Sequence, residues 1–171
     1  MKLKVLLEGK PFMTEYGIVG YSTVVFIACD DGKNILYDCG SKGCVLQLKE
    51  ALEKAGMKPE DITHVVISHL HFDHVGNLPL FSNAQILLSE TEWESANQTP
   101  DEWHSIQTLA YLEKRGNLHF VKEKDMIAED VSVMELPGHT PGLIGLRCGA
   151  ESILCSDAMK NLSLIHISEP T

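Results

Sequence analysis

The chain has 171 residues, of which 44% are hydrophobic and 22% charged, a composition typical of one soluble globular domain rather than a disordered segment. Its formal net charge of −10 argues against nucleic acid as a partner, because phosphate binding normally needs a basic surface. No apolar run approaches the roughly 18 residues that span a bilayer, and the N-terminal segment lacks the features of a signal peptide. The five cysteines are odd in number and include no C-x-x-C pair, so we expect a reduced, cytoplasmic location.

The expected elements run from strands to helices and back to strands. Apolar, β-branched runs predict strands at residues 2–8, 22–29, 35–38, 62–68, 83–88, 118–121, 131–136, 143–148 and 153–156. Apolar residues at helical spacing predict helices at 44–55, 89–96 and 101–115. This order indicates sheets covered by helices, an α+β architecture, and argues against a helical bundle.

The predicted helix at 89–96 carries a clear start signal. Ser89 is expected as its N-cap, with Glu92 completing a capping box. Glu90, Glu92 and Glu94 are expected to form an acidic face in contact with solvent.

Three histidines and one aspartate crowd into a single short segment, which follows the strand expected at 62–68. They are His69, His71, Asp73 and His74. Burying these groups without partners would cost several kcal/mol, and metal coordination removes that cost. Residues i and i+2 of an extended segment point the same way, so His69 and His71 can grip one ion. The chain then turns, so Asp73 and His74 are expected to point toward a second ion position.

Two further polar positions stand at the ends of apolar runs. His139 is framed by glycine and proline in a loop between two expected strands, which can hold an imidazole rigidly. Asp157 follows the last expected strand. Each signal is weak alone.

Taken together, these motifs resemble the metallo-β-lactamase superfamily over residues 1–161. The match is to its H-x-H-x-D-H motif, its later single histidine and its bridging aspartate. The resemblance implies a four-layer αββα sandwich, with the second half incomplete in this chain. It implies that His69, His71 and His139 hold one metal, that Asp73 and His74 hold a second, and that Asp157 bridges them. Asp38 matches an early strand-end aspartate that supports the metal loop without binding metal.

The end of the chain departs from the family pattern. The family adds one more histidine to the second metal, several tens of residues after the bridging aspartate, whereas this chain ends 14 residues after Asp157. We therefore expect that the last ligand is missing and that the domain, at residues 1–161, is truncated. Residues 162–171 are expected to be a non-native tail, and His166 within it is too close in sequence to replace the ligand.

The resemblance implies a metal-dependent hydrolase with a binuclear centre. Two divalent ions, zinc first and iron or manganese as alternatives, would hold a bridging hydroxide that attacks an ester, lactone, thioester or amide carbonyl. Asp73 would orient this nucleophile and move its proton. The expected partner is a small-molecule substrate, with no nucleic acid and no membrane, and the oligomeric state is left open.

The subfamily stays open at this point. The motifs look like those of the acyl-homoserine-lactone lactonases, glyoxalase II and metallo-β-lactamase domain-containing protein 1. Lys160 stands where the lactonases have a tyrosine. The alternatives are a nuclease, a mononuclear iron persulfide dioxygenase of the same fold, and an inactive metal-binding fragment.

Overall fold

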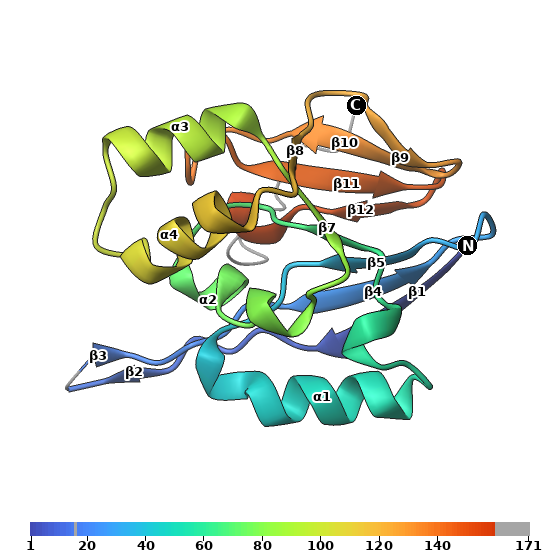
Figure 1. The fold of residues 1–171 in the computed structure, drawn as a ribbon, viewed down its shortest axis with the longest axis horizontal. Coiled ribbons are helices and arrows are strands. Elements are labelled where there is room, and N and C mark those ends of the chain that lie inside the picture. The colour runs from blue at the N-terminus through green and yellow to red at the C-terminus, as the bar shows by residue number, and fades with distance from the viewer. Residues whose placement is uncertain (16, 160–171) are drawn as a thin grey trace, which may run out of the picture.

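The computed structural model describes residues 1–15 and 17–159, and these contain two main sheets (Figure 1). The six-stranded sheet has the order β1 (Lys2–Leu7), β4 (Val24–Ala28), β5 (Asn34–Tyr37), β6 (His64–Val66), β7 (Gln85–Leu88) and β8 (Leu118–Phe120). The four-stranded sheet has the order β12 (Ser152–Leu154), β11 (Ile144–Cys148), β10 (Val131–Glu135) and β9 (Met126–Ala128). The expected non-native tail at 162–171, with His166, and also Lys160 lie outside the described residues.

Strand direction divides the larger sheet into two parts. β1, β4 and β5 pair antiparallel, whereas β5, β6, β7 and β8 pair parallel. Parallel neighbours need crossover connections, and helices supply them after β5, β6 and β7. The smaller sheet is antiparallel throughout. The mixed α+β class expected from the sequence is therefore confirmed.

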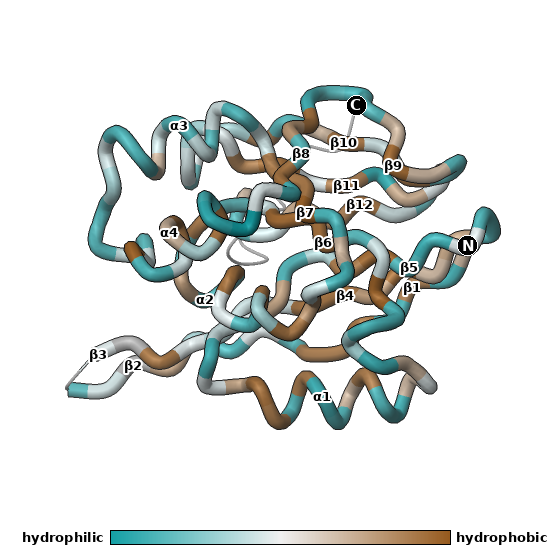
Figure 2. Tube along the Cα trace, viewed as in Figure 1, coloured by the Kyte–Doolittle hydropathy of each residue, from teal (hydrophilic) through white to brown (hydrophobic). Residues whose placement is uncertain are grey.

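Helices and sheets form successive layers. The helices are α1 (Val45–Lys54), α2 (Phe72–Val75), α3 (Glu90–Gln98) and α4 (Ile106–Arg115), with 3-10 turns at Lys42–Cys44, Pro59–Asp61, Leu78–Leu80 and Ser156–Ala158. One apolar core joins α1 and α4 to the six-stranded sheet, and a second core lies between the two sheets. Figure 2 shows this as hydrophobic segments running through the sheets, with hydrophilic segments in many turns and on helix surfaces.

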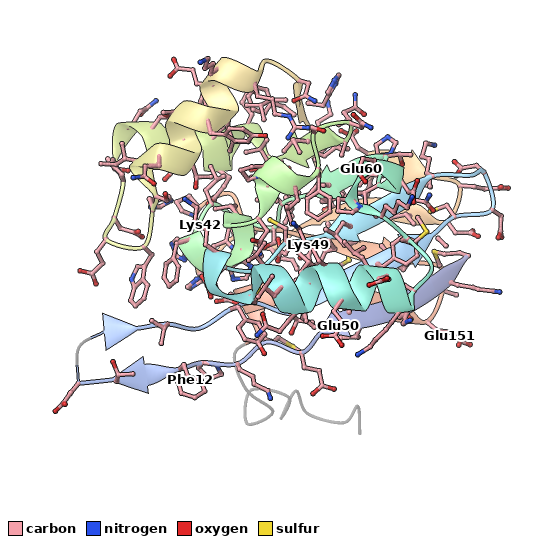
Figure 3. All side chains as sticks on the ribbon, turned by 60° about the horizontal axis from the view of Figure 1, so that its bottom comes forward. Phe12, Lys42, Lys49, Glu50, Glu60 and Glu151 are labelled. Atoms are coloured by element: carbon pink, nitrogen blue, oxygen red, sulfur yellow. The ribbon has the colours of Figure 1, made fainter. Side chains whose placement is uncertain are left out.

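The sequence pattern of α1 explains its position. Leu48 and Leu52 are one helical turn apart and fully buried against the sheet. Lys49 and Glu50 lie on the outer side of the helix and are exposed (Figure 3). The hydrophobic residues therefore lie on one face of α1, and this face packs against the sheet.

The fourth helix begins later than the sequence predicted. The expected helix covered residues 101–115, but α4 begins at Ile106, with the Ser105 hydroxyl accepting a hydrogen bond from the Thr108 amide. Asp101 accepts a hydrogen bond from the Trp103 amide, which forms a turn instead of a helical start. The segment 101–104 is therefore free to contact the histidine-rich loop.

Two features of the structure were not expected from the sequence. A short hairpin of β2 (Met13–Thr14) and β3 (Gly17–Ile18) extends away from the body of the molecule (Figure 1). Phe12, just before β2, is exposed (Figure 3). Strand β9 was also missed. Among the described helices, none is both long and apolar enough to cross a membrane.

Candidate metal centre

The sequence-predicted ligands meet at one edge of the two sheets. His69, His71, Asp73 and His74 lie in and after the connection from β6 to α2. His139 comes from the connection between β10 and β11, and Asp157 from the turn that follows β12. The Ile144 amide donates to the Ser68 carbonyl over 3.0 Å, which joins β11 to the end of the β6 segment. Both sheets therefore contribute to one site.

Three imidazoles form the first cluster. The Nδ1 atom of His71 lies 3.1 Å from Nε2 of His69 and 3.1 Å from Nε2 of His139. Two nitrogens bound to one tetrahedral zinc at the usual bond length lie about 3.3 Å apart. These ring nitrogens are therefore spaced as the ligands of a single ion would be, and the residues present fit such an ion.

Carboxylates form a second cluster beside the first. His74 Nε2 lies 3.6 Å from Asp157 Oδ1 and 3.7 Å from Asp73 Oδ2. The other oxygen of Asp157, Oδ2, lies 3.4 Å from Nε2 of His139. Ligand atoms of His69, His74 and Asp157 all lie within 4.8 Å of one another. Asp157 thus faces both clusters with one oxygen each.

Burial keeps His69 and His71 in the neutral form that a metal requires. Burial lowers the pKa of His71 to about 4, although the nearby Asp101 raises it. Burial lowers the pKa of His69 even further, and the neighbouring His74 adds to this. At neutral pH these two imidazoles therefore keep a lone pair for coordination.

His74 sits in a different electrostatic environment. Burial lowers the pKa of His74, but the Asp38 carboxylate raises it, and Asp73 and Asp157 add to that effect, so the net shift is upward. Its Nδ1 atom lies 2.8 Å from Asp38 Oδ2. Asp38 therefore holds the ring so that Nε2 faces Asp73 and Asp157.

Asp38 is buried and organises the loop around it. Its Oδ1 atom accepts a hydrogen bond of 2.8 Å from the Ser68 amide, and its Oδ2 atom accepts one of 2.8 Å from the Ser68 hydroxyl. The Ser156 hydroxyl donates to the same carboxylate over 3.3 Å. Asp38 contacts His74 through Nδ1, on the side away from the carboxylate cluster, as a supporting residue would.

The sequence did not predict the residues that contact His71 on its Nε2 side, away from His69 and His139. The Nε2 atom of His71 lies 3.3 Å from Asp101 Oδ2, and Asp101 Oδ1 lies 2.8 Å from His104 Nδ1. The Phe72 amide also donates to the Trp103 carbonyl over 2.9 Å. His104 lies within the segment 101–115 that the sequence predicted as a helix. An aspartate and a histidine three positions apart at a predicted helix start gave no signal of these contacts.

The expectation for Glu92 was wrong. Its side chain is only 1% exposed rather than solvated, and it does not complete a capping box. The Ser89 hydroxyl does accept from the Glu92 amide over 3.0 Å, so Ser89 is the N-cap as predicted. The Glu92 carboxylate points instead toward Leu70 and Thr140, which lie beside the histidines.

A cavity of about 530 Å³ opens beside the carboxylate cluster. Its lining includes Lys10, Tyr21, Asp73, His74 and Asp157. Its volume lies in the range of small-molecule sites, which is about 300–1,000 Å³. The candidate metal centre is therefore reachable from a cavity large enough for a small substrate.

Comparison with known proteins agrees with this geometry. Residues 17–156 match the family model of the metallo-beta-lactamase superfamily. An N-acyl homoserine lactonase of Bacillus cereus is 35% identical over 91 residues, which are 53% of this chain and 34% of the relative. Metallo-beta-lactamase domain-containing protein 1 of Xenopus laevis is 34% identical over 106 residues, 62% of this chain and 40% of the relative.

Solved structures show the same architecture. A crystal structure of a Thermotoga maritima protein, described as a metallo-beta-lactamase, has a TM-score of 0.72 and 25% identity, covering 88% of this chain and 73% of that one. The matched part of this chain spans only about a third to two fifths of the two curated relatives. Because the family model matches most of the sequence, the chain belongs to the metallo-beta-lactamase superfamily.

Proposed function

We propose that this chain holds two divalent cations at the candidate metal centre and hydrolyses a small ester, lactone or thioester. The observation that carries the proposal is the convergence of three imidazole nitrogens from segments of both sheets. His71 Nδ1 lies 3.1 Å from the ring nitrogens of His69 and His139, next to two carboxylates. Protein interiors do not gather such groups without a compensating partner. A cation supplies that partner.

The geometry supports an assignment of each ligand. His69, His71 and His139 would hold the first ion. Asp73 and His74 would hold the second, without the further histidine that the family uses and that is expected to be missing from this chain. Asp157 would bridge the two, since its oxygens lie 3.4 Å from His139 Nε2 and 3.6 Å from His74 Nε2. Imidazole and carboxylate ligands suit zinc, with iron and manganese as alternatives.

The bound cations would supply a nucleophile near neutral pH, by lowering the pKa of water, and would polarise the substrate carbonyl. The chain itself contributes proton transfer and orientation. Asp73 lines the cavity, and its side chain is 28% exposed, so its carboxylate can reach both the nucleophile and the leaving group. It would hold the nucleophile's proton and pass it to the departing oxygen or sulfur.

Charge and cavity size support a small-molecule substrate. A net charge of −10 disfavours a polyanion and so argues against the nuclease alternative. The lactonase name of one relative supports a lactone as the first substrate to test. The five cysteines, all free thiols, support a location in the reducing cytoplasm.

Metal content and turnover together test the proposal. Wild-type chain, His69→Ala, Asp73→Asn and the control His119→Ala, which changes an exposed histidine, are equilibrated with Zn²⁺ and analysed for metal. We expect two ions in the wild type and the control, and fewer in His69→Ala. Turnover of a lactone and a thioester should fall by about 10²–10⁴-fold in Asp73→Asn.

Three outcomes would contradict the proposal. A wild-type chain with no bound ion would remove the metal centre altogether. One ion per chain, with activity supported by iron and not by zinc, would indicate the mononuclear alternative instead. Turnover in Asp73→Asn equal to that of wild type would show that this carboxylate moves no proton in the reaction.

A further inference from the structure

Glu92 lies on α3, outside both ligand clusters, and is buried without a cationic partner. None of the ion pairs among the described residues involves it. A buried carboxylate is costly unless hydrogen bonds compensate for the lost water. The structure provides three donors. The Leu70 amide donates to Oε1 over 2.9 Å, while the Thr140 hydroxyl at 2.7 Å and the Gly142 amide at 3.2 Å donate to Oε2.

These three donors come from the two loops that carry the histidine ligands of the first ion. Leu70 lies between His69 and His71, and Thr140 follows His139. In sequence Glu92 is 22 residues from Leu70 and 48 from Thr140. One carboxylate therefore links the two loops, with one oxygen for each.

The start of α3 also contacts the second loop, which follows His139. The Ser89 hydroxyl donates to the Gly142 carbonyl over 2.8 Å. A Cβ atom at Gly142 would lie 2.1 Å from the Glu92 amide nitrogen, so only glycine allows this approach. The loop is thus fixed against α3 by backbone contact in addition to the Glu92 carboxylate.

We infer that Glu92 is a positioning residue for the metal centre, which sets the distance between the His69–His71 pair and His139 by holding both loops. This inference rests on the proposed function, because it needs a metal at the three imidazoles. Residues that orient metal ligands typically change metal affinity by about 10–100-fold when they are mutated. A helix cap or a packing residue would instead affect stability alone.

The matched pair Glu92→Gln and Glu94→Gln tests this inference. Both changes lie on α3, but Glu94 is exposed. Glutamine at 92 has one acceptor and one donor group, so it must turn its NH₂ toward the amide of Leu70 or of Gly142 and lose that hydrogen bond. Zn²⁺ affinity is measured by competition with a chromophoric chelator, and ligand geometry by the visible spectrum of the Co²⁺-loaded chain.

We expect Glu92→Gln to weaken Zn²⁺ binding by about 10–100-fold and to change the Co²⁺ spectrum at saturation, with Glu94→Gln like wild type. Thermal unfolding in EDTA shows which variants are folded before metal is added. A folded Glu92→Gln chain with wild-type affinity and spectrum, and only a lower melting temperature, would overturn the inference and leave the metal centre intact. A wild-type chain that binds no Zn²⁺ would overturn both.

Thr140 provides a second route should Glu92→Gln fail to fold. Thr140→Val removes one donor to the carboxylate and keeps the two backbone donors, whereas Thr140→Ser keeps the hydroxyl. We expect Thr140→Val to bind Zn²⁺ more weakly than Thr140→Ser. Equal affinities in these two variants would count against the positioning role of the Glu92 carboxylate.

Discussion

Asp38 shows how one buried side chain can serve several segments. It receives hydrogen bonds from Ser68 and Ser156 and orients His74 over 2.8 Å, so three distant parts of the chain meet at its carboxylate. Its backbone has a φ of 58°, in the left-handed region that few residues other than glycine adopt. Aspartate and asparagine tolerate this region better than most residues. The position therefore demands both an acceptor and an unusual backbone.

Replacing Asp38 by asparagine keeps the size and the backbone tolerance but changes one acceptor into a donor. We expect Asp38→Asn to lose about 1–3 kcal/mol in the free energy of unfolding, measured with urea, because a buried polar group loses its partner. An NH₂ group facing His74 Nδ1 would also move the ring proton to Nε2 and block that atom as a ligand. The variant should therefore bind fewer Zn²⁺ ions. Asp130→Asn, at an exposed site, is the control, and equal ion counts in both would contradict this role.

The turn after α2 depends on the close approach of two backbone segments. Gly76 caps α2 with ordinary helical dihedral angles, and its amide donates to the Gly40 carbonyl over 2.8 Å. A Cβ atom there would lie 2.4 Å from the Lys42 amide nitrogen. The loop that follows β5 thus packs directly on the helix that carries Asp73 and His74.

We expect Gly76→Ala to destabilise the chain by about 1–3 kcal/mol, since two backbone segments must separate. Gly43→Ala is a matched control nearby, because its Cβ atom would meet only the Ser41 hydroxyl at 3.7 Å, an ordinary contact. Chemical unfolding of both variants checks the difference. If both alanines cost the same, the close approach at Gly76 is not what constrains this turn.

Much of the element pattern was predictable from local sequence. The strands of the larger sheet, α1 and the start of α3 follow from apolar runs, a helical stripe and the Ser89 cap. Strands β2 and β3 have two residues each, too few to show a period. The start of α4 was misplaced because Ser105, not an earlier residue, caps it.

The ligand set was proposed from one dense motif and a family resemblance, and the structure brings those side chains together. The side chains that hold these ligands in position could not be predicted from the sequence. Glu92 and Asp101 resemble ordinary surface acids in the sequence, and their roles depend on contacts with residues 22 to 48 positions away. Such contacts leave no local period or spacing that a single sequence could reveal.

The chain buries imidazoles where its two sheets meet, so its stability without metal should depend on pH. The pKa of His71 is about 4 in the folded chain and about 6.5 when unfolded, because burial disfavours the charged ring. Between these values the unfolded chain binds more protons. Stability from this group is thus full above pH 6.5 and is lost as the pH falls toward 4.

We expect the free energy of unfolding in EDTA to fall by about 2 kcal/mol between pH 7 and pH 5 through His71, with His69 acting in the same direction. His74, whose pKa is raised, offsets part of this loss. Urea unfolding at the two pH values measures the change, and His71→Asn should show a smaller one. A chain equally stable at pH 5 and pH 7 would contradict the sign of these shifts.

The hydrogen bond of 2.9 Å between Ser68 and Ser156 joins residues 88 positions apart. During synthesis, Asp38 and Ser68 leave the ribosome long before Ser156 does. Strands β1, β4, β5 and β6 can therefore pair before Ser156 is available to contact Ser68. Contacts between such distant residues form slowly, because a long loop must close first. This contact would therefore form after the N-terminal strands of the larger sheet have paired.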